Sequence, residues 1–67
     1  MKIGDKVIIY RKSTCYYWVP YMDNMVEESG TVVGFVGEGS SAIAFKADKD
    51  RGNDFWIIPK TSLKYKR

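Results

Sequence analysis

The sequence predicts an all-β domain, a half-open barrel of five short strands with a long first loop and a short 3₁₀ turn before the last strand. Runs of apolar and β-branched residues of strand length recur through the 67 residues, each bounded by Gly, Pro or polar turn residues. No apolar segment has the length and periodicity of an independent helix. A chain this short can bury only one modest core, so we expect a single domain over residues 1–67.

The expected strands follow one another at short intervals. They span residues 6–10, 31–36, 41–47, 55–58 and 63–66. In the long first loop, Met22, Met25 and Val26 have the spacing of a single helical turn. Gly30 follows this turn, where a left-handed residue commonly ends a helix. Pro59 stops the fourth strand and begins a tight 3₁₀-type turn.

Alternation of side chains within these strands predicts the residues of the core. The expected core side chains are Val7, Ile9, Val32, either Val33 or Phe35, Ile43, Phe45, Ile57 and Leu63. Gly34 lies in the middle of a strand, where Gly is unfavourable unless the strand is bulged or bent. We therefore expect Gly34 to mark a kink that lets one strand serve both halves of the barrel.

The order of these segments resembles the Src-homology-3 (SH3-like) barrel. The sequence Phe-Trp-Ile-Ile-Pro-Lys-Thr-Ser-Leu at 55–63 is similar to the aromatic strand, turn and closing strand that end such domains. Gly-Asp-Lys-Val at 4–7 and Gly-Thr-Val-Val-Gly at 30–34 resemble strand openings in SH3-like modules, including mind-bomb-type repeats and KOW-type barrels. With Trp-Val-Pro-Tyr-Met-Asp at 18–23, the chain also resembles small phage-encoded barrels of unassigned role, which implies docking on a host or viral protein.

Composition argues against several classes of function. Cys15 is the only cysteine and there is no histidine, so neither an internal disulfide nor a zinc site of the usual Cys/His type can form. The sequence has no Gly-rich phosphate loop, and Cys15 has no base near it beyond Lys12. We expect no enzymatic activity, no cofactor, no metal and no small-molecule substrate.

Hydropathy and cysteine content indicate the cellular compartment of the chain. No apolar run approaches the roughly 18 residues that a membrane span needs. The N-terminal residues lack the apolar segment of a signal peptide, and the single cysteine suits a reducing compartment. We expect a cytoplasmic protein with no membrane partner, located in the host cytoplasm if it is phage-encoded.

The first candidate contact surface is aromatic, because the first loop has more aromatic side chains than so small a barrel can bury. The expected partner-binding residues are Tyr16, Tyr17, Trp18, Tyr21, Met22 and Trp56. Tyr and Trp frequently anchor protein interfaces, but these side chains could equally plug the barrel and cover its mouth. SH3 domains bind Pro-rich peptides with similarly placed aromatics. Here their tandem Trp pair is replaced by Phe55-Trp56, so we do not expect that specificity.

The second candidate surface is basic. Residues 1–14 hold four basic side chains against one acidic, residues 43–67 hold seven against three, and residues 15–42 hold four acidic side chains and no base. In an SH3-like barrel the first and last strands are neighbours, which gathers basic side chains. The possible nucleic-acid contacts are Lys2, Lys6, Lys60, Lys64, Lys66 and Arg67. They form either a solvated surface or a stripe for weak, backbone-directed nucleic-acid binding, which is our alternative to a protein partner.

Overall fold

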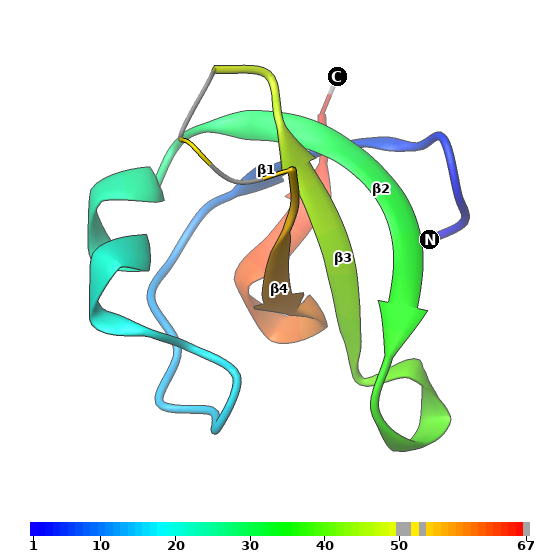
Figure 1. Cartoon of the computed structure of the whole chain (residues 1–67), viewed down its shortest axis with the longest axis horizontal. Helices are drawn as coiled ribbons and strands as arrows, with labels where there is room; N and C mark the ends of the chain where they lie inside the picture. The colour runs from blue at the N-terminus through cyan, green and yellow to red at the C-terminus, as the bar shows by residue number, and fades with distance from the viewer. Residues whose placement is uncertain (50–51, 53, 67) are drawn as a thin grey trace.

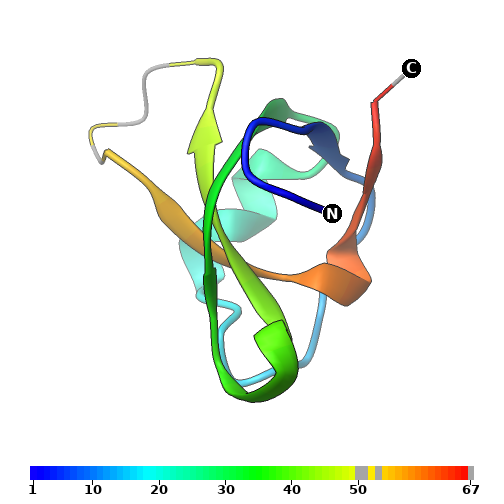
Figure 2. The same cartoon turned by 90° about the vertical axis from the view of Figure 1, so that its right-hand side faces the viewer.

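The computed structural model describes residues 1–49, 52 and 54–66, and it is all-β apart from 3₁₀ turns, written η (Figure 1). The elements are β1 (Lys6–Ile9), η1 (Pro20–Met25), β2 (Ser29–Val36), η2 (Glu38–Ser40), β3 (Ala42–Ala47), β4 (Trp56–Pro59), η3 (Lys60–Ser62) and β5 (Leu63–Tyr65). The strands form one antiparallel sheet in the order β4-β3-β2-β1-β5. Among the described residues β4 and β5 do not pair, so the curled sheet stays half-open (Figure 2). The predicted fold class is confirmed.

The long strand β2 joins the two halves of the sheet, and Gly30 is the residue at the junction. Gly30 lies opposite Val7 of β1 and Ala47 of β3. A Cβ atom at Gly30 would overlap the carbonyl oxygen of Lys46 and the ring of Phe45. A side chain at this position would therefore push β2 away from β3 or displace the largest side chain of the core.

The kink expected at Gly34 is present as a β-bulge. The pairing of β2 with β3 shifts register between Val32 and Gly34, which leaves Val33 as the extra residue. A Cβ at Gly34 would meet only the Cβ of Ala44, at an ordinary 3.6 Å. The bend therefore comes from the extra residue in the strand and does not depend on the missing side chain of Gly34.

The end of the first loop differs from the sequence prediction. Gly30, expected to end a helical turn in the left-handed conformation, lies within β2 instead. The positive φ angle, 77°, belongs to Glu27. The Glu27 N–H donates to the carbonyl oxygen of Ile9, and the Ile9 N–H donates to the carbonyl oxygen of Glu28 at 3.0 Å. These two bonds close the loop onto the end of β1, so the geometry of the chain reversal is set by β1.

The core contains most of the predicted side chains, with two corrections. The buried apolar residues are Val7, Ile9, Met22, Met25, Val32, Ala42, Ile43, Phe45, Ile58 and Leu63. Val33 and Phe35 are 42% and 40% exposed: the bulge displaces Val33, and Phe35 lies near the end of β2. Ile58 is buried in place of Ile57, because Ile58 lies opposite Ile43 on the inner face of β3.

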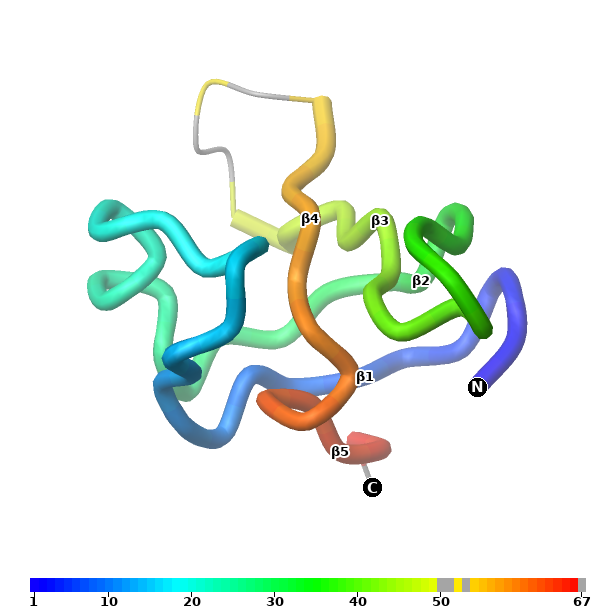
Figure 3. Tube along the Cα trace, turned by 90° about the horizontal axis from the view of Figure 1, so that it is seen from below, coloured from blue at the N-terminus to red at the C-terminus, as the bar shows by residue number. Residues whose placement is uncertain are grey.

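The first loop completes the core. Met22 and Met25 of η1 are 1% and 0% exposed and belong to the same apolar cluster as the strand residues. Pro20 occupies the first turn of η1, where its fixed φ and missing N–H are tolerated. Thus the part of the loop that plugs the barrel is the pair of methionines, and in Figure 3 the loop lies to one side of β4.

The glycine contacts give a testable contrast. We expect Gly30→Ala to lower the free energy of unfolding by about 1–3 kcal/mol, because the new methyl group overpacks the core. Gly34→Ala, the matched control, should change it by less than about 0.5–1 kcal/mol, since its methyl group meets an ordinary contact. Urea unfolding followed by tryptophan fluorescence measures both values. Equal stability of the two variants would show that β2 and β3 are not closely packed at Gly30.

Candidate functional site

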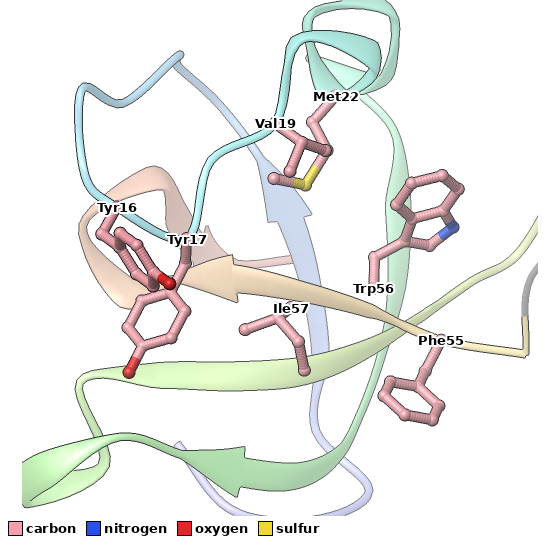
Figure 4. A pocket seen from close by; sticks show the side chains of 7 residues that line it. All are labelled: Tyr16, Tyr17, Val19, Met22, Phe55, Trp56 and Ile57. Carbon is pink, nitrogen blue, oxygen red and sulfur yellow. The ribbon is translucent and has the colours of Figure 1, made fainter.

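The first loop and the start of β4 enclose an open groove of about 530 Å³. The residues that line it are Tyr16, Tyr17, Val19, Met22, Phe55, Trp56 and Ile57 (Figure 4). We call it the aromatic groove. Among the residues that the structure describes, none of the lining side chains is charged, and the volume lies within the range of about 300–1,000 Å³ that is typical of ligand sites. It suits an uncharged, apolar group.

The two tyrosines at the tip of the loop form one end of the aromatic groove. Tyr16 is 93% exposed, and its ring meets the ring of Tyr17 edge-on, with the centroids 5.6 Å apart. Tyr17 is half-buried and reaches the turn between β2 and β3, where its hydroxyl lies close to Gly37. A Cβ at Gly37 would lie 2.6 Å from that oxygen. The turn therefore supports Tyr17, while Tyr16 projects into solvent.

The other end of the aromatic groove is formed by Trp56 and Phe55. Trp56 packs on the core and is stacked by Tyr21, with ring centroids 5.1 Å apart and an interplanar angle of 11°. Its indole Nε1 is buried and has no hydrogen-bond partner among the described residues. Phe55 is 52% exposed. Trp56 is thus held in place by its neighbours, and Phe55 offers an accessible apolar surface beside it.

Trp18 holds the loop and does not line the aromatic groove. It is half-buried against the core, and its Nε1 donates to Asp23 Oδ1 at 2.8 Å. The Lys12 ammonium lies 3.6 Å from the other oxygen of Asp23. Of the six expected contact residues, four line the groove, namely Tyr16, Tyr17, Met22 and Trp56. The other two, Trp18 and Tyr21, contact Asp23 and Trp56 instead.

Three lining residues were absent from the predicted set: Val19, Phe55 and Ile57. The run from Phe55 to Ile58 is apolar throughout, so sequence alternation alone does not show which side chains face outward. β4 is an edge strand. Pro59 at its end was an available signal, because proline within sheets is largely confined to edges, bulges and strand ends.

The basic surface is partly as predicted, because β1 and β5 are neighbours. Lys64 lies opposite Ile8, and the Lys66 N–H donates to the Lys6 carbonyl oxygen at 3.0 Å. The Lys64 ammonium is 5.5 Å from the centroid of the Tyr10 ring. We call the surface formed by Lys6, Lys64, Lys66 and Tyr10 the basic strip. Arg11, which sequence analysis did not include, lies beside it with its guanidinium 5.1 Å from the Tyr10 centroid.

Asp48 offsets part of the charge of the basic strip, and the neutral Ser29 hydroxyl links it to Lys66. The Lys6 ammonium is 3.1 Å from Asp48 Oδ1. The Ser29 hydroxyl donates to Asp48 Oδ2 at 2.8 Å, and the Lys66 ammonium donates to the same hydroxyl at 3.3 Å. A phosphate at this end of the strip would have to compete with the Asp48 carboxylate for the Lys6 ammonium.

Three of the expected basic contacts are not shown to join the basic strip. The Lys60 ammonium lies 5.5 Å from the centroid of the Phe35 ring, at the end of β2. Lys2 donates its backbone N–H to Asp5 Oδ2 at 2.9 Å in the N-terminal turn. Arg67 lies outside the described residues. The predicted set of bases is thus only partly gathered on one face.

Comparison with protein families, with characterised proteins and with solved structures finds no match to this chain. In the part of the chain that the structure describes, no three His, Cys, Asp or Glu side chains gather as a metal site would require. None of the helices there is long and apolar enough to cross a membrane. The SH3-like resemblance remains a prediction from the sequence.

The contacts of Asp48 make stability depend on pH. The Ser29 hydroxyl, followed by the Lys6 ammonium, lowers the pKa of Asp48 below its ordinary value of 3.8. Just below pH 3.8 the unfolded chain therefore binds the proton that the folded chain still excludes. The stabilisation is complete above pH 3.8 and is lost as pH falls through the folded pKa. We expect Asp48→Asn to melt below the wild type at pH 7 and the difference to shrink as the pH falls below 3.8. A constant difference from pH 2 to 7 would contradict this assignment.

Proposed function

We propose that this chain is a non-enzymatic binding module that contacts a protein partner through the aromatic groove. The observation that supports it is the set of exposed aromatic side chains, Tyr16 and Phe55, at the rim of an uncharged groove. Tyrosine and tryptophan give large contact areas at low cost in conformational entropy. The resemblance to phage-encoded barrels adds that the partner is a host or viral protein whose activity the module alters.

The packing of the loop favours recognition with little rearrangement. Met22 and Met25 bury one end of the loop in the core, and Trp18 is bonded to Asp23. Side chains that are already ordered lose less entropy when a partner binds. The described lining residues are all uncharged, which favours an apolar protein surface over a phosphate-bearing ligand, because phosphate contacts are made mainly by Lys, Arg and hydrogen-bond donors.

A second candidate function is weak nucleic-acid binding by the basic strip. The observation that favours it is the grouping of Lys64 and Arg11 around the ring of Tyr10, next to Lys66. Cationic side chains beside an aromatic ring suit single strands, whose backbone is charged and whose bases stack. It ranks second because Asp48 offsets the charge of Lys6.

The first function is tested with a variant that changes only exposed lining residues. We expect the double variant Tyr16→Ser, Phe55→Ser to stay folded and to lose at least about tenfold in affinity for a partner that the wild type captures, because exposed aromatic anchors carry much of the binding energy. Tyr65→Ser is the control, since Tyr65 is similarly exposed, at 51%, but lies outside the groove. Affinities are measured with the purified partner. Equal binding by the wild type and the double variant would refute the proposal.

The second function is tested by the salt dependence of binding to fluorescent single-stranded and duplex oligonucleotides. If the basic strip binds phosphates, Lys64→Gln should lower the slope of log affinity against log salt by about 0.9 on duplex DNA. Lys60→Gln is the control, because Lys60 lies elsewhere, against Phe35. No binding at low salt, or equal slopes for both variants, would remove this candidate.

A further inference from the structure

The edge of β4 that borders the aromatic groove carries unpaired backbone groups. The Lys60 N–H donates to the Ser41 carbonyl oxygen at 3.1 Å, which identifies these opposite residues as a hydrogen-bonded pair. Bonded and non-bonded pairs alternate along an antiparallel ladder. With Ile58 opposite Ile43 and Ile57 opposite Ala44, Ile58 is at a bonded position and Ile57 is not. The N–H and C=O of Ile57 therefore point away from β3.

Two further observations agree with this assignment of bonded and non-bonded pairs. Pro59, which has no N–H, lies opposite Ala42 at the next non-bonded position, where no donor toward β3 is needed. Among the described residues, no group outside the sheet forms a hydrogen bond with Ile57. The backbone of Ile57 thus offers one donor and one acceptor at the edge of an apolar groove.

The groove beside this edge is bounded on its far side by the first loop. Val19 and Met22 of the first loop line the opposite wall, and Figure 4 shows the side chains of Trp56 and Ile57 leaving β4 in opposite directions. A strand added to β4 would also direct its side chains alternately to two sides. One side meets Trp56 and the other meets Ile57, so both sides are apolar.

We infer, on the basis of the proposed function, that the partner segment is an extended peptide that adds to β4 as a further strand. Its backbone pairs with the N–H and C=O of Ile57, as in other cases of strand addition. Because both sides of the added strand meet apolar residues, the segment has a short run of consecutive uncharged, apolar residues. The four-residue length of β4 and the terminal Pro59 limit the pairing to a short stretch.

The test uses a synthetic peptide selected on the immobilised full chain from a random display library. Ile57→Pro removes the outward N–H without removing a bond to β3, and edge strands tolerate proline at such positions. We expect Ile57→Pro to raise the Kd of this peptide about tenfold, the effect of one lost hydrogen bond. Ile57→Val keeps the N–H and trims the side chain, so it should lose less affinity than Ile57→Pro.

Two measurements on the wild-type protein do not depend on the folding of Ile57→Pro. The peptide should slow the hydrogen exchange of the Ile57 amide. N-methylation of one residue in the peptide should abolish binding, while N-methylation of its immediate neighbours is tolerated, because only alternate amides of a strand face the same side.

The outcomes separate this inference from the proposed function. Strand addition would be overturned by a peptide whose binding is weakened by the double variant Tyr16→Ser, Phe55→Ser, but which leaves the Ile57 amide unprotected and tolerates every N-methyl group. That result would still support the proposed protein-binding function. If no selected peptide binds the groove, both strand addition and the proposed protein-binding function are refuted. Protection of the Ile57 amide that rises with protein concentration in the absence of peptide would assign the edge to a second copy of the chain and overturn the inference.

Discussion

Burial of Met22 and Met25 is the interaction on which the rest of the structure depends. A sheet of five short strands does not fill its own interior, and the two methionines of η1 complete the apolar cluster. The flexible, unbranched Met side chain suits such a gap. Because this packing fixes one end of the first loop, Tyr21 stacks on Trp56 and the loop stands beside β4. The aromatic groove is therefore a consequence of how the core is closed.

The fold was predictable because its signals are local. Short apolar runs, turn residues and the proline before η3 predict the strands and their order of appearance. Positions that depend on pairing between strands were not predictable. Val33 is exposed because of a register shift, and Gly30 is required by the Phe45 ring on the next strand. Gly34 in the middle of the strand indicated the bend, but the sequence does not show that the bulge exposes Val33 or that Phe45 requires a glycine at position 30.

The sequence predicts the groove residues of the first loop better than those of β4. An excess of aromatic residues in one loop indicates that some remain exposed, and Tyr16 does. Trp18 looks the same in the sequence, yet it is anchored by Asp23 five residues later. Phe55 and Ile57 belong to a run that reads as a core strand. Their outward direction depends on the phase of pairing with β3, which composition does not encode.

The two edges of the half-open sheet are treated differently, and this difference bears on function. β5 carries Lys64 and is followed by Lys66, and lysine on an edge strand discourages pairing with other chains. β4 has no charged residue, and its free edge presents the N–H and C=O of Ile57, while Pro59 at the next outward position has no N–H to donate. Natural proteins generally protect both edges of a sheet, because an open apolar edge promotes aggregation. Here the first loop partly screens the edge of β4 while leaving Ile57 beside an open groove. An edge that is screened but not closed admits a single strand more readily than a second sheet, which is the arrangement that selective peptide binding requires.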